Sequence, residues 1–108
     1  MDNVFQKGSV ADLNQLIDYS AGGVVSKQLV KNPAGTITLF SFDKGEGLSE
    51  HTAPFDAMVQ ILDGEMTLHL DGVVHEMKKG DTIIMPAGSL HALFAKEQFK
   101  MLLTMIRG

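Results

Sequence analysis

The sequence predicts a single all-β domain, built as a sandwich or barrel of short strands. About eight or nine short apolar or alternating runs follow one another with turn residues at close spacing, a pattern typical of these folds. Asp71-Gly72, between two such runs, is the strongest hairpin signal in the chain. The 108 residues can bury roughly two-thirds of their unfolded surface in one core. We therefore expect one domain over residues 1–108, with an N-terminal cap over 1–23 and a barrel over 24–108.

Composition excludes several classes of function. The chain has no cysteine, which excludes disulfides, zinc-thiolate sites and thiol nucleophiles and is compatible with a reducing compartment. Its net charge of −4, with nine scattered basic residues, argues against a nucleic-acid partner. No apolar stretch approaches the roughly 20 residues of a membrane span, and the first residues lack the pattern of a signal peptide. We expect a cytoplasmic protein without nucleic-acid or membrane partners.

The N-terminal region predicts a short helix. Ser9 resembles an N-cap, Asp12 would supply an acidic first turn, and apolar residues follow at helical spacing at Leu13, Leu16 and Ile17. The pattern predicts a helix over about residues 10–18 that covers one end of a sheet. Ser20-Ala-Gly-Gly23 ends it.

The remaining elements are strands separated by turn residues. Asp63-Gly64 is expected to end one strand, and Thr82–Met85 has the apolar composition of a strand covered on both faces. The expected strands are Val24–Val30, Thr36–Phe42, Ala57–Leu62, Glu65–Leu70, Val73–Met77, Thr82–Met85, His91–Phe94 and Phe99–Ile106.

Two of these strands, 57–62 and 99–106, carry apolar residues on both faces. One face would fill the barrel. The other must be covered by the N-terminal helix or by a second subunit, because large exposed apolar patches are rare on monomers. We therefore expect a homodimer.

Two glycine and histidine patterns carry the functional signal. In the later one, Gly80 precedes a strand, Pro86 ends that strand, Gly88 can adopt a positive φ, and His91 opens the next strand. A histidine just after such a corner can point into a cavity. In the earlier pattern five residues separate Gly45 from His51, and a further glycine follows at Gly64.

Together, these spacings resemble the two motifs of the cupin family, over roughly Thr36–Arg107. The resemblance implies a double-stranded β-helix, or jelly-roll, barrel, which the short N-terminal helix expected above would precede. In metal-bearing cupins three histidines and one glutamate converge inside the barrel. Here Ala53 occupies the second histidine position, and Ala57 or Met58 the glutamate position. Ala95 replaces the closing asparagine of the second motif.

The resemblance leaves His51 and His91 as the expected ligands of a divalent metal, which could be Mn, Fe, Ni, Cu or Zn. Two imidazoles make a weak site, since structural zinc takes four protein ligands and catalytic zinc usually three. Asp56 and Gln60 are the nearest further candidates. By strand alternation, however, Gln60 shares a face with Met58, away from the expected interior.

Several functions remain open. The first is a barrel that binds a small molecule, with a divalent metal held weakly by His51 and His91. The second is a metal-free binding or sensing barrel, or a small cupin enzyme of the isomerase or lyase type in which the two histidines act as acid and base. The third is a purely structural dimerisation unit. The expected pocket lining is Ala53, Ala57, Met58 and Met85. We expect His69 and His75, outside the motifs, to be solvated.

Overall fold

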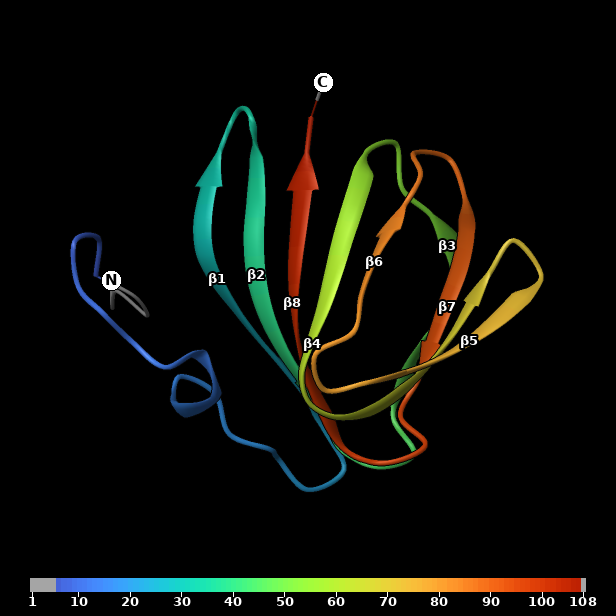
Figure 1. Ribbon diagram of the computed structural model, residues 1–108, viewed down its shortest axis with the longest axis horizontal. Coiled ribbons are helices and arrows are strands. Elements are labelled where there is room, and N and C mark those ends of the chain that lie inside the picture. Colours follow the sequence, from blue (N-terminus) through green and yellow to red (C-terminus); the bar gives the residue numbers. More distant parts are fainter. Residues whose placement is uncertain (1–5, 108) are drawn as a thin grey trace.

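The computed structural model describes residues 6–107, and its strands curl into a half-open barrel (Figure 1). One short 3₁₀ turn, η1 (Leu13–Gln15), precedes the strands. Among the described residues, no helix has the length and hydropathy needed to span a membrane. The strands are β1 (Val24–Asn32), β2 (Gly35–Phe42), β3 (Gly47–Thr52), β4 (Asp56–Leu70), β5 (Val73–Lys78), β6 (Thr82–Met85), β7 (Leu90–Phe94) and β8 (Phe99–Ile106).

Strand β4 joins the two halves of the barrel. Its first part pairs with β8 and β6, and its second part pairs with β5 and β7. The first half thus runs β1-β2-β8-β4-β6, and in the second half β3 lies beside β7. All these pairings are antiparallel, and several join strands that are not consecutive in the chain, such as β2 with β8 and β4 with β7.

The expectation of two strands over 57–62 and 65–70 was wrong, because β4 runs through Asp63-Gly64 without ending. The register shifts between Ile61 and Asp63, and Gly64 has a φ of +76°. A bulge and a glycine bend the strand instead of terminating it, which lets one strand belong to both halves of the barrel.

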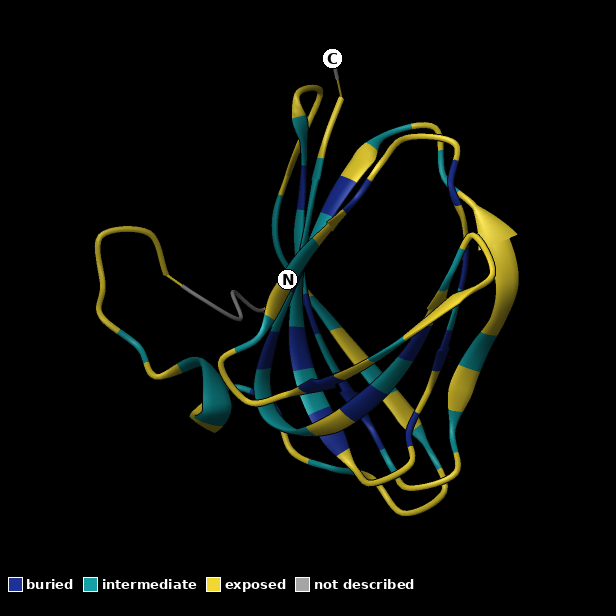
Figure 2. Cartoon of the chain, turned by 45° about the vertical axis from the view of Figure 1, so that its right-hand side comes forward, coloured by how far each residue is buried: buried dark blue, intermediate teal, exposed yellow. Residues whose placement is uncertain are grey.

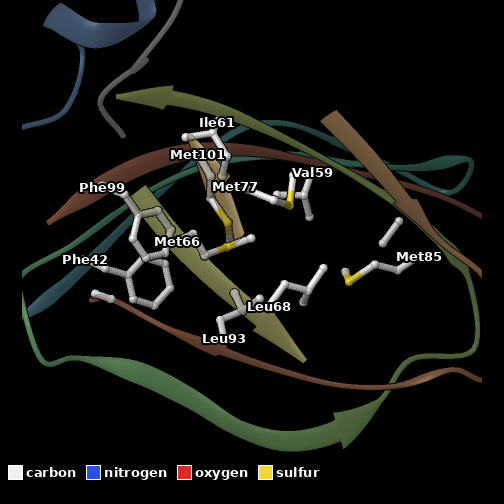
Figure 3. Packing of buried hydrophobic residues seen from close by; sticks show 12 residues of the cluster. Phe42, Val59, Ile61, Met66, Leu68, Met77, Met85, Leu93, Phe99 and Met101 are labelled. Carbon is white, nitrogen blue, oxygen red and sulfur yellow. The ribbon is translucent and has the colours of Figure 1, made fainter. Parts of the chain in front are cut away.

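The barrel is filled by aliphatic, aromatic and thioether side chains (Figure 3). The rings of Phe42 and Phe99 stack with centroids 4.6 Å apart. Flexible methionines fill the irregular space beside them, as thioethers do in many cores. The buried cluster comprises Phe42, Ala57, Val59, Ile61, Met66, Leu68, Met77, Met85, Leu93, Ala95, Phe99 and Met101.

The predicted helix over 10–18 is also wrong, since only η1 forms there. Asp12, rather than Ser9, is the cap, and its side chain accepts a hydrogen bond from Asn14 N–H at 3.0 Å.

Tertiary contacts explain why this segment does not continue as a helix. Two lysines of the sheet donate to backbone carbonyls that a longer helix would use as acceptors. Lys27 Nζ donates to Leu16 O at 2.7 Å, and Lys100 Nζ donates to Asn14 O at 2.8 Å. Ile17 is buried, with 1% of its surface exposed. A helix of two turns is marginal on its own, so these contacts decide the conformation.

Burial also differs from expectation in β6. Thr82–Met85 was expected to be covered on both faces, yet Thr82 and Ile84 are exposed, and Ile84 keeps 61% of its surface accessible. Only the face that carries Met85 is buried in the barrel. The outer face of β6 is therefore partly exposed to solvent. Figure 2 shows exposed residues, in yellow, alternating with buried ones along the strands.

Candidate functional site

His51 and His91 are brought together by strand pairing at one end of the barrel. They are direct cross-strand partners in the antiparallel pair β3 and β7. Their ring centroids lie 4.2 Å apart at an interplanar angle of 61°. His91 is buried, whereas His51 is exposed. Two histidines that lie forty positions apart in the sequence thus have their rings in contact. The ring of His51 is at the surface, and the ring of His91 lies beneath it.

The two rings are held in the same way. His51 Nδ1–H donates to the carbonyl of Ser49 at 2.7 Å, and His91 Nδ1–H donates to the carbonyl of Ser89 at 3.2 Å. A carbonyl can only accept, so each neutral ring carries its proton on Nδ1 and keeps a lone pair on Nε2. This is the tautomer in which imidazole binds a metal or accepts a hydrogen bond through Nε2.

The environment of His91 favours its neutral form. Burial lowers the pKa of His91 below its ordinary value, and the neighbouring His51 lowers it further, against the opposing effects of the Ser89 carbonyl and Asp71. His91 therefore retains its Nε2 lone pair at neutral pH.

Asp71 is a site residue that the sequence pattern did not single out. It occupies the β4–β5 turn at a φ of +47°. Its Oδ1 accepts from Leu90 N–H, and its own N–H donates to Leu90 O, both at 2.8 Å. These two hydrogen bonds hold the turn against Leu90, the residue before His91. The only sequence signal was that of a hairpin turn, which does not reveal which neighbouring strand the turn contacts.

The loop around Pro86 is hydrogen-bonded to the segment that follows His51. Gly88 N–H donates to Ala53 O, and Ala87 N–H donates to Asp56 Oδ1, each at 2.8 Å. Asp56, considered above as an additional metal ligand, is thus engaged with the corner backbone. In the described part of the chain, no group of three or more His, Asp or Glu side chains is arranged to hold a metal ion.

Ala53 lies in the loop between β3 and β4, and four other predicted site residues divide between the two faces of the first half-barrel. Ala57 and Met85 are cross-strand partners in the buried interior, each 3% exposed. Met58 and Gln60 alternate with the buried residues of β4 and so lie on its outer face. Neither Met58 nor Gln60 therefore lines the interior beside the two histidines.

The two histidines outside the motifs differ in burial. His69 is exposed on β4, whereas His75 on β5 is only half-buried. His75 alternates with buried Met77, so its ring lies on the inner face of β5.

Known proteins support the same architecture. A model of the cupin domain matches residues 38–107. A conserved protein of unknown function from Streptococcus pyogenes is 38% identical and superposes with a TM-score of 0.92, covering 99% of this chain and 93% of that one. A cupin superfamily protein from Desulfitobacterium hafniense is 30% identical, with a TM-score of 0.89 and coverage of 99% and 97%.

A cupin 2 conserved barrel domain protein from Leptotrichia buccalis is 43% identical with a TM-score of 0.84, over 87% of this chain and 46% of that one. The match of the cupin domain covers more than half of the sequence, and the structural similarity extends over almost all of it. The chain therefore belongs to the cupin family.

Proposed function

We propose that the end of the barrel around His51 and His91 binds a small molecule, and that a divalent metal ion can be held there weakly by the two Nε2 atoms. The observation that supports this most directly is the matched tethering of both rings. Each Nδ1–H donates to a backbone carbonyl two residues earlier, so this hydrogen bond does not use the Nε2 lone pair of either ring. Such fixed orientation is what a ligand-binding imidazole pair requires.

The donor set fits an open metal site rather than a closed one. Among the described residues, two imidazoles meet and no acidic side chain completes a group of three. A divalent ion of the kinds that accept imidazole would bind through these two nitrogens and leave most of its coordination positions to water or to the small molecule. Bound there, the ion would act as a Lewis acid on an oxygen of the small molecule. Weak, exchangeable binding is the consequence.

A second candidate is recognition of the small molecule without metal. The lowered pKa of His91 favours its neutral imidazole, which can accept a hydrogen bond from a hydroxyl or amide group, and the ring of His51 lies in contact with it. Ala57 and Met85 are buried in the apolar interior of the barrel, which would suit a ligand with one polar and one apolar end.

The test is a calorimetric titration of tag-free, metal-stripped protein with Zn²⁺ and Ni²⁺. We expect about one ion to bind per chain, and His51→Ala and His91→Ala each to weaken binding at least about tenfold, because each removes one of two ligands. His69→Ala is the matched control, since it removes an exposed imidazole on β4 and should leave the isotherm unchanged.

Unchanged binding in both His51→Ala and His91→Ala would overturn the metal assignment, as would the absence of binding by the wild type. In either case a screen of small molecules by thermal shift tests the second candidate. A ligand that raises the melting temperature of the metal-free wild type, but not of His91→Ala, supports it. A shift of equal size in both proteins rejects the histidine pair as the site.

A further inference from the structure

The barrel wall is open between β5 and β6. Among residues 6–107, β5 pairs only with β4, and β6 also pairs only with β4. The two strands diverge from the turn that joins them, so each has one edge without a neighbouring strand (Figure 1). A depression of about 420 Å³ lies between them, and we call it the edge gap. Its lining residues are Val74, His75, Glu76, Met77, Asp81, Thr82 and Ile83.

The register of the hairpin shows which backbone groups of β5 face the edge gap. The two-residue turn between β4 and β5 makes the residues that flank it a hydrogen-bonded pair, and such pairs alternate along an antiparallel ladder. The N–H and C=O groups of Val74 and Glu76 therefore point away from β4. Lys78 follows the same alternation, because its N–H donates to Asp81 Oδ2 and its C=O accepts from Asp81 N–H, both at 2.9 Å.

The backbone of β6 presents similar groups on the other side of the gap. Ile61 of β4 donates its N–H to Asp81 O at 3.0 Å, and Ile61 O accepts from Gly80 N–H at 2.9 Å. Alternation from this contact leaves Thr82 and Ile84 with N–H and C=O groups directed away from β4. Backbone groups along a strand edge are a template for pairing with another chain. The edge gap is therefore bordered by two such templates.

The two faces of the edge gap differ in chemistry. On the barrel side it is lined by Met77 and Ile83, which belong to or pack against the core, and by half-buried His75. The outer side carries the exposed side chain of Glu76, and Asp81 lies where the two strands meet. Among the described residues, none that lines the gap is a lysine or an arginine. An added strand would thus need aliphatic side chains toward the barrel and basic ones outward, because side chains alternate between faces.

The present ion pair of Glu76 does not prevent such a contact. Lys96 Nζ lies 3.9 Å from Glu76 Oε2, and the two side chains are 67% and 58% exposed. Exposed pairs of this kind contribute little to stability. A basic side chain of an added strand can therefore approach the same carboxylate.

We propose that the edge gap binds an extended segment of another protein, in which aliphatic and basic residues alternate, by addition of a strand to β5. Val74 and Glu76 would each supply one N–H and one C=O to the added strand, and the carboxylates would attract its basic residues. Addition to β5 is favoured over addition to β6, because the six residues of β5 span about 20 Å and the four of β6 about 13 Å.

Fluorescence anisotropy of a labelled peptide of about seven alternating Val and Lys residues, with blocked ends, tests this with the full chain. The short edge predicts weak binding, with a dissociation constant of about 10 to 100 µM at low salt. An alternating Val and Glu peptide should bind at least about tenfold more weakly, because its charge is reversed. The Val and Lys peptide with methylated backbone nitrogens should also lose at least about tenfold, because it keeps its charge but cannot donate backbone hydrogen bonds.

Variants of the protein separate the backbone contribution from the side chains. Val74→Pro removes one edge N–H that does not bond to β4, a position where an edge strand tolerates proline, and should weaken binding at least about tenfold. Val74→Ala keeps that N–H and should change affinity less than about threefold. Glu76→Gln should weaken binding at least about threefold. Glu97→Gln is the matched charge control, since Glu97 is paired with Lys44 outside the gap, and it should leave affinity unchanged.

Absence of binding to the wild type up to about 1 mM peptide would overturn the proposal. Equal affinity for the basic and acidic peptides would do the same, as would full affinity of the methylated peptide, which would reduce the contact to attraction between charges. Circular dichroism checks that each variant is folded, and the methylated peptide decides the question on the unaltered protein. None of the lining residues belongs to the pair His51 and His91, so the outcome is independent of metal or small-molecule binding there.

Discussion

Replacement of Gly64 by Ala is expected to lower the free energy of unfolding more than the same replacement at a turn where no atom lies close to the added Cβ. Gly64 has a φ of +76°, and a Cβ placed there would lie 1.8 Å from Gln98 O and 2.8 Å from Phe99 Cα. The left-handed backbone costs a non-glycine residue about 1–2 kcal/mol. Displacing the backbone that the Cβ meets costs about 1–3 kcal/mol more. Gly64→Ala should therefore lower the free energy of unfolding by about 2–5 kcal/mol, out of about 5–15 for a domain.

Two other glycines separate these contributions. Gly72 has a φ of +81° but no atom within 4 Å of a Cβ, so Gly72→Ala should show the backbone effect alone, about 1–2 kcal/mol. Gly35 lies outside the left-handed region, and its Cβ would meet Met105 O at 2.1 Å, so Gly35→Ala should show the steric effect alone. Urea unfolding followed by circular dichroism measures all three. The reasoning is refuted if Gly64→Ala is no more destabilised than Gly72→Ala.

Two further predictions concern the site. Asp56→Ala should lower the free energy of unfolding by about 0.5–1.5 kcal/mol, because Ala87 N–H loses its acceptor, while metal affinity stays within about twofold; a large loss of affinity in the calorimetric titration would instead make Asp56 a ligand. Because the pKa of His91 is lowered in the folded chain, protons bind the unfolded chain more readily, and stability should fall as the pH drops below about 6.5 toward the folded pKa. Thermal melts between about pH 8 and pH 5 measure how steeply stability falls with pH. The fall should be smaller in His91→Asn than in the wild type and unchanged in the control His69→Asn. The same fall in all three proteins would contradict the role of His91.

Much of the fold could be predicted because its signals are local. The Asp71-Gly72 turn, the alternation along β4 and the apolar run of β8 are visible in single segments, and the structure has a turn at the first and strands at the other two. The spacing of Gly80, Pro86, Gly88 and His91 indicated the family, and the match of the cupin domain shows it.

The errors arose where distant residues compete with local preference. The segment around η1 has helical spacing, but Lys27 and Lys100 from the sheet take its carbonyls. Asp63-Gly64 looks like a turn, yet the pairing of β4 with β8 carries the strand through it. In both cases tertiary hydrogen bonds outweigh a local signal that is small by itself.

The sequence by itself determined that the chain is an all-β cupin barrel and that His51 and His91 are its candidate ligands, because strand periodicity and motif spacing are properties of the chain in order. Only the tertiary structure decided how those ligands are presented. It places the rings 4.2 Å apart, directs each Nδ1–H to a carbonyl, and engages Asp56 with the corner backbone. These features depend on the register between β3 and β7 and on loop contacts across the barrel, which no spacing along the chain specifies.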